Sequence, residues 1–83
     1  MKELEIAIDR RCCNEKKVSI NIFEKKIQQK LYSYKIDFTY SESPIDAFCE
    51  YGHTIINFVN ISKEEQDSIV NNINQIFNEL IEV

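Results

Sequence analysis

The apolar residues of the final third of the chain repeat at helical spacing, and this pattern constrains the fold more than any other. The side chains that share the stripe are Ile69, Val70, Ile73, Ile76, Phe77, Leu80 and Ile81. The segment Ser62-Lys63-Glu64-Glu65 precedes them and matches the Ser-x-x-Glu capping box. The sequence therefore predicts a long amphipathic helix that opens at this box.

Period-two alternation predicts strands in the first half. Leu4, Ile6 and Ile8 alternate with smaller or acidic residues, which predicts a strand over residues 3–11. A second strand, with apolar residues at positions 36, 38 and 40, ends at the loop 41–44, because Pro44 cannot donate to a ladder.

Two further apolar runs, residues 47–51 and 54–61, flank the only glycine and resemble a hairpin with Gly52-His53 at its tip.

Between the first two strands, an apolar stripe predicts a helix over residues 19–34, although a short strand at 18–22 is an alternative. The members of this stripe are Ile20, Phe23, Ile27, Leu31 and Tyr34. The expected fold is a single α+β domain, residues 1–83, of order β-α-β-β-β-α, with a mostly antiparallel sheet and both helices on one face.

The cysteines and the only histidine form two clusters, Cys12-Cys13 and Cys49-x-x-x-His53. Thiolate and imidazole are the ligands that structural zinc prefers, so these four residues predict a zinc site that braces the hairpin against the first strand. One of the adjacent cysteines can be a bystander, with Glu15, Glu50 or water completing the site. In the alternative interpretation, Cys49 is a buried apolar residue and His53 a turn residue. A Cys–His nucleophile and a thiol redox switch are further alternatives.

Several functional classes are disfavoured. The beginning of the chain has no hydrophobic leader and no stretch is long enough to span a bilayer, so we expect a cytoplasmic protein that does not bind membranes. One glycine excludes a phosphate-binding loop and a dinucleotide fingerprint. No catalytic constellation is present in the sequence, so we do not expect an enzyme.

Charge is divided along the chain. Residues 1–36 carry nine Lys/Arg against five Asp/Glu, whereas residues 37–83 carry one lysine against nine acids, within a net charge of −4. An acidic surface repels nucleic acids and attracts basic proteins, many of which bind nucleic acids. We therefore expect a protein partner and no direct binding of nucleic acid, with the chain itself a monomer or a homodimer.

The side of the final helix opposite its apolar stripe is the candidate partner-binding surface, although an ordinary solvated helix face is the plainer interpretation. Its acidic and amide side chains are Glu64, Asp67, Asn71, Asn74, Asn78, Glu79 and Glu82. Such a row of acids and amides can imitate spaced phosphates and occupy a basic groove.

Two resemblances bear on function. The order of elements, with Leu4-Glu5-Ile6-Ala7-Ile8 at the start and Ser62-Lys63-Glu64-Glu65 opening the last helix, resembles the DinI-like modulators of the RecA filament. That resemblance implies an acidic final helix that competes with single-stranded DNA.

In size, acidity and richness in Asn, Ile, Lys and Glu, the chain also looks like the phage-borne anti-CRISPR inhibitors of low-GC bacteria. This resemblance implies a non-enzymatic inhibitor that binds a Cas nuclease and blocks nucleic-acid loading, and it is the hypothesis we favour. A RecA modulator and a small metal- or thiol-responsive regulator are the alternatives.

Overall fold

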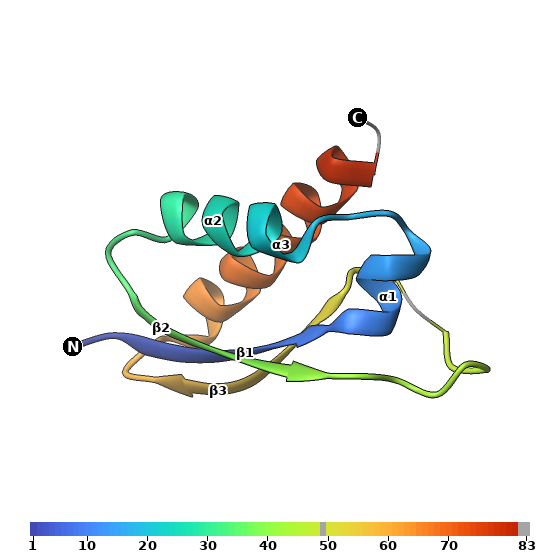
Figure 1. Cartoon of the computed structure of the whole chain (residues 1–83). Helices are drawn as coiled ribbons and strands as arrows, with labels where there is room; N and C mark the ends of the chain where they lie inside the picture. Colours follow the sequence, from blue (N-terminus) through green and yellow to red (C-terminus); the bar gives the residue numbers. More distant parts are fainter. Residues whose placement is uncertain (49, 82–83) are drawn as a thin grey trace.

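The computed structural model describes residues 1–48 and 50–81. Its elements, in order, are β1 (Glu3–Asp9), α1 (Arg10–Glu15), α2 (Ile20–Lys30), β2 (Lys35–Ser41), β3 (His53–Val59) and α3 (Lys63–Ile81). The strands form one sheet of order β2-β1-β3, in which β1 is parallel to β2 and antiparallel to β3 (Figure 1). The parallel pair is possible because α1 and α2 carry the chain back to the start of the sheet.

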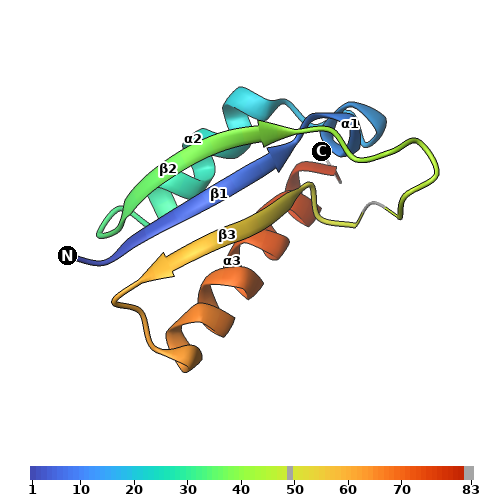
Figure 2. The ribbon, with the colours of Figure 1, turned by 90° about the horizontal axis from the view of Figure 1, so that it is seen from below.

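The two longer helices, α2 and α3, lie over the same face of the sheet (Figures 1 and 2). The core between the layers contains the inward side chains of β1 and the apolar stripes of both helices. Its fully buried members include Ile6, Ile8, Phe23, Ile27, Ile69, Ile73 and Phe77. In the described part of the chain no helix covers the opposite face of the sheet, and Glu5, Asp37 and Asn57 lie side by side there.

The expected α+β class and the placement of two helices on one face are confirmed, but three details of the expected architecture are wrong. The chain has a short additional helix, α1, where the end of the first strand was predicted. The described residues of the predicted strand 47–51 do not join the sheet, which has three strands. The sheet is mixed and not mostly antiparallel.

Capping explains why the first strand stops early. The Asp9 carboxylate accepts a hydrogen bond of 3.1 Å from the Cys12 amide and so caps α1. At the other end, the amides of Lys17 and Val18 donate to the carbonyls of Asn14 and Cys13, and Lys17 has a φ of 59°. This pair of bonds is the Schellman arrangement, in which glycine is the favoured residue at the left-handed position.

We therefore expect Lys17→Gly to stabilise the protein by about 0.5–1 kcal/mol, because a side chain at this position strains the left-handed backbone. The measurement is urea unfolding at neutral pH. Lys16→Gly is the matched control, since Lys16 has a φ of −87° and gains nothing from glycine. A loss of stability in the Lys17 variant would contradict the assigned geometry.

Only one of the two hydrogen bonds of the capping box is formed at the start of α3. Ser62 Oγ accepts from the Glu65 amide at 3.2 Å, as the pattern predicts. The Glu65 carboxylate, however, accepts hydrogen bonds from Lys2 Nζ at 2.8 Å and from the Tyr34 hydroxyl. These two donors lower the pKa of Glu65. This residue therefore ties α3 to the beginning of β1 and β2 instead of closing the box.

Candidate partner-binding surface

The side chain of Arg11 holds residues that the sequence predicted to be a loop, at 41–44, and the start of a hairpin strand, at 47–51. Its Nε donates to the Ser43 carbonyl at 2.8 Å, and its Nη2 donates to the Ala47 carbonyl at 2.9 Å and to Ser43 Oγ at 3.0 Å. Only 13% of the Arg11 side chain is exposed. We call residues 42–48 the clamped loop, because one guanidinium satisfies backbone carbonyls that a strand would have paired.

Asp9 completes the attachment of the clamped loop to α1. Its Oδ2 accepts from Ser43 Oγ at 2.6 Å, while its other oxygen caps the helix. Burial alone would raise the pKa of Asp9, but the hydrogen bonds from Ser43 and the Cys12 amide, with the charge of Arg11, lower it below its ordinary value. Asp9 is therefore a carboxylate at neutral pH, and the loop is held by charge-assisted bonds.

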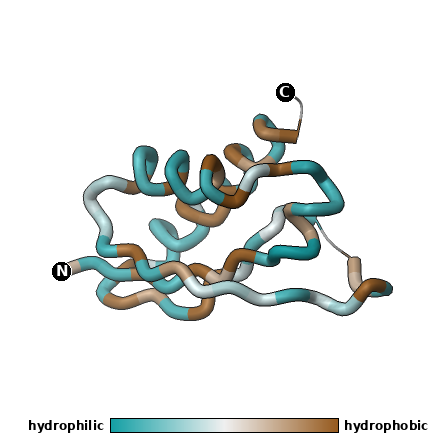
Figure 3. The backbone as a smooth tube through the Cα atoms, viewed as in Figure 1, coloured by the Kyte–Doolittle hydropathy of each residue, from teal (hydrophilic) through white to brown (hydrophobic). Residues whose placement is uncertain are grey.

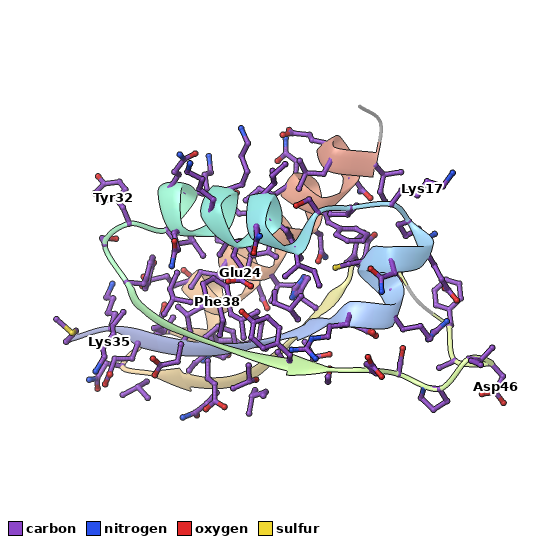
Figure 4. All side chains as sticks on the ribbon, viewed as in Figure 1. Lys17, Glu24, Tyr32, Lys35, Phe38 and Asp46 are labelled. Carbon is purple, nitrogen blue, oxygen red and sulfur yellow. The ribbon has the colours of Figure 1, made fainter. Side chains whose placement is uncertain are left out.

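The clamped loop presents large apolar side chains to solvent. Ile45 is 88% exposed and Phe48 is 87% exposed, and the acids Glu42 and Asp46 are exposed beside them. Figure 3 shows apolar positions at this end of the molecule, and Figure 4 places Asp46 at the tip, away from the body of the protein. The clamped loop therefore combines exposed apolar and acidic side chains with a backbone that the part-buried Arg11 holds in place.

Among the described residues of the acidic and amide row predicted on α3, all but one are exposed. The side chains found exposed are Glu64, Asp67, Asn71, Asn78 and Glu79. Asn74 is the exception, because it is half-buried and its Oδ1 lies 2.8 Å from His53 Nε2. Glu82 lies outside the described residues.

Part of this acidic row is neutralised within the protein. Lys63, the only cation of α3, lies 3.1 Å from the Asp67 carboxylate. Among the residues that the structure describes, nine exposed or half-exposed acids form no ion pair with a cation. They are Glu5, Asp9, Glu24, Asp37, Glu42, Asp46, Glu50, Glu64 and Glu79. The exposed lysines are concentrated elsewhere, on the α1–α2 connection and on α2.

The structure describes three of the four predicted zinc ligands. Cys12 and Cys13 are buried on α1, and His53 is the first residue of β3. Cys49 lies outside the described residues. Within residues 1–48 and 50–81, no three His, Cys, Asp or Glu side chains are grouped so that they could hold a metal ion.

Cys13 is a poor nucleophile in this setting. Its thiol contacts the Gly52 carbonyl at 3.9 Å, and burial, with the nearby negative charge of Asp9, raises its pKa to about 11. The thiol is therefore protonated at neutral pH, whereas a reactive cysteine requires the thiolate.

His53 lines a hollow of about 630 Å³ between the clamped loop, β3 and α3. Phe48, Tyr51, Phe58 and Asn74 contribute to the same walls. When Nε2–H donates to Asn74 Oδ1, the other ring nitrogen, Nδ1, is an acceptor, and it is buried without a hydrogen-bond partner among the described residues. Burial lowers the pKa of His53, against the opposing effect of the Asn74 bond, so the ring is neutral at pH 7.

The lowered pKa of His53 predicts a loss of stability in mild acid. As the pH falls below about 6.5, His53 is protonated in the unfolded chain but stays neutral in the folded protein. The free energy of unfolding therefore decreases until the pH reaches the lower pKa of the folded state. The slope from this one group is at most about 1.4 kcal/mol per pH unit. Urea unfolding between pH 7.5 and 5.5 measures it. His53→Gln should abolish this component, and an unchanged slope would contradict the assignment.

Sequence reasoning missed Arg11, Asp9 and Ser43 as the residues that hold the clamped loop. Arg11 and Ser43 are 32 positions apart, so no local pattern in the sequence links them. A proline after a strand was the only local sign of an ordered loop.

Comparison with known proteins gives no match to any protein-family model, curated protein or solved structure. No helix in the described part of the chain is long and apolar enough to cross a membrane. Functional inference therefore depends on the geometry described above.

Proposed function

We propose that this protein is a non-enzymatic inhibitor of anti-CRISPR type. It binds a Cas nuclease through acidic and apolar side chains, and it prevents nucleic acid from entering the basic channel of that nuclease. The observation that carries the proposal is the clamped loop, where Arg11 holds the backbone at Ser43 and Ala47 while Ile45 and Phe48 are exposed on the same loop as the acids Glu42 and Asp46.

Charge and apolarity have separate roles in this proposal. The acids of the clamped loop and of α3 attract a basic groove over a distance and accelerate association. Ile45 and Phe48 supply buried contact area, since a few large side chains carry most of the energy of a typical interface.

The experiment measures binding to a panel of purified Cas nucleases from low-GC bacteria, without guide RNA, by calorimetry. We expect one nuclease to bind at a ratio of one to one. Ile45→Ser with Phe48→Ser should weaken that binding about tenfold or more. In a separate stopped-flow measurement, Glu64→Gln with Asp67→Asn should reduce mainly the association rate and its dependence on salt.

Lys25→Gln, on the exposed side of α2, is the control and should leave binding unchanged. Absence of binding to every nuclease would overturn the proposal. Tight binding that the loop and α3 variants leave intact would show that another surface is used.

A structural zinc ion on Cys12, Cys13, Cys49 and His53 stays a prediction, since the four residues are not all described. Zinc held by these residues would brace the segment before β3 against α1. Elemental analysis of the purified protein, with melting before and after a chelator, tests it. A full equivalent of zinc and a lower melting temperature without it are expected.

Modulation of the RecA filament is a second candidate, supported by the exposed acids Glu64, Asp67 and Glu79 on α3. It is distinguished by strand exchange, which a RecA modulator alters and a Cas inhibitor does not. The third candidate, a thiol-responsive regulator, requires a reactive cysteine, and the protonated thiol of Cys13 argues against that residue in the role.

A further inference from the structure

The outer edge of β2 carries unpaired backbone groups. β2 has β1 as its neighbour on one side, and no described strand lies on the other. The Lys35 amide donates to the Lys2 carbonyl at 3.0 Å, so the peptide groups of Lys35 point towards β1. Because successive residues of a strand alternate, the N–H and C=O groups of Ile36, Phe38 and Tyr40 point away from the sheet.

The two edges of the sheet differ in regularity. β3 carries a register shift where it pairs with Glu5 and Ile6, and such bulges protect an edge from further pairing. β2 pairs with β1 without interruption from Lys35 to Ser41. The three residues whose backbone groups point outward have uncharged side chains, so no inward charge protects this edge either.

We propose that β2 pairs with β2 of a second copy of this chain, antiparallel, about a two-fold axis at Phe38. In this register Phe38 faces Phe38 of the second copy, and Ile36 faces Tyr40 of the second copy. Every outward N–H and C=O of Ile36, Phe38 and Tyr40 then has a partner. The two sheets become one continuous sheet, with the helices of both copies on the same face.

Shape complementarity supports this register. Tyr40 is 45% exposed, although its hydroxyl donates to Glu24 at 2.6 Å. A surface hollow of about 220 Å³ lies beside the start of β2, between Leu31, Tyr34 and Ile36. In the proposed register Ile36, which lines this hollow, faces Tyr40 of the second copy. Figure 4 shows Tyr32, which also lines the hollow, pointing into solvent at the same end of the strand.

The distribution of charge is also compatible with this register. Asp37 faces the Thr39 hydroxyl of the second copy, and Lys35 faces the Ser41 hydroxyl of the second copy, so no charge meets a like charge. An axis at Asp37 would set that carboxylate against itself, which destabilises a sheet. An axis at Ile36 would require the Tyr34 amide, which already donates to the Leu31 carbonyl at 3.0 Å.

The experiment is sedimentation equilibrium of the whole protein over a wide concentration range. We expect the mass to rise with concentration from 9.8 kDa to twice that value. Thr39→Asp sets two pairs of like charges against each other and should raise the dimer dissociation constant about tenfold or more, which is 1.4 kcal/mol. Adding Asp37→Lys to Thr39→Asp should restore the dimer, because the introduced lysine faces the introduced aspartate.

Thr54→Asp is the matched control, because Thr54 and Thr39 flank the same residue, Ala7, on opposite edges of the sheet. It should leave the dimer intact. A monomer at every concentration, or a dimer that Thr39→Asp does not weaken, would overturn the proposal. A dimer dissociated by Thr54→Asp and not by Thr39→Asp would place the interface at β3 and would overturn it equally. Circular dichroism confirms that each variant is folded.

Discussion

Replacing Gly52 by alanine should destabilise the protein by roughly 2–4 kcal/mol, through backbone strain and a steric clash. Gly52 has a φ of 69°, a conformation that a residue with a side chain adopts at a cost. A Cβ atom built there would lie 2.4 Å from Cε1 of Phe77, which is fully buried. The backbone cannot move away easily, because the Gly52 carbonyl accepts from the Asp9 amide at 2.9 Å.

Urea unfolding of Gly52→Ala, with and without Phe77→Leu, separates the two causes. The smaller leucine gives space to the added methyl group, so the two changes together should cost less than the sum of their separate costs by about 1 kcal/mol or more. Strict additivity would mean that strain at φ alone accounts for the loss, and that Phe77 is not in contact as described.

Truncating Phe23 to alanine should cost about 3–5 kcal/mol, a large part of the stability of a chain of this size. Phe23 is fully buried on α2, and its ring lies 5.2 Å from the ring of Phe77 on α3 and 6.3 Å from that of His53 on β3. It therefore joins three elements at one point. The cavity left by its removal cannot close without moving a helix.

The same unfolding measurement should give a smaller loss for Phe23→Leu, which keeps most of the volume. Ile22→Ala is the control on the same helix, because Ile22 is about half exposed and its truncation should cost under about 1 kcal/mol. If Phe23→Ala and Ile22→Ala lost equal stability, the assigned packing between α2 and α3 would be wrong.

Patterns that depend on one element were predictable from the sequence. The stripe containing Phe23 and Ile27 identified α2, and the alternation of Leu4, Ile6 and Ile8 identified β1, because burial of one face imposes the period. The predicted ends were less accurate, since Asp9 forms a cap that turns the chain into α1. Asp9 alternates correctly for a strand, so the pattern alone did not show the cap.

Features that depend on distant contacts were not predictable. Residues 47–51 have the composition of a strand, but the Ala47 carbonyl accepts from Arg11 and not from a neighbouring strand. Asn74 was predicted on the side of α3 opposite the apolar stripe, but its half-buried environment depends on which side of α3 faces His53. The candidate binding surface therefore emerged from the fold, while the acids on α3 were already visible in the sequence.

The order in which the inhibitor and nucleic acid meet the nuclease tests the proposed function most directly. A Cas nuclease that binds this protein is mixed with it either before or after the guide RNA and target DNA are loaded, and cleavage of the DNA is followed. We predict strong inhibition when the protein is added first and little when it is added last, with the difference reduced by Ile45→Ser and Phe48→Ser. Equal inhibition in either order, or none in both, would contradict the account.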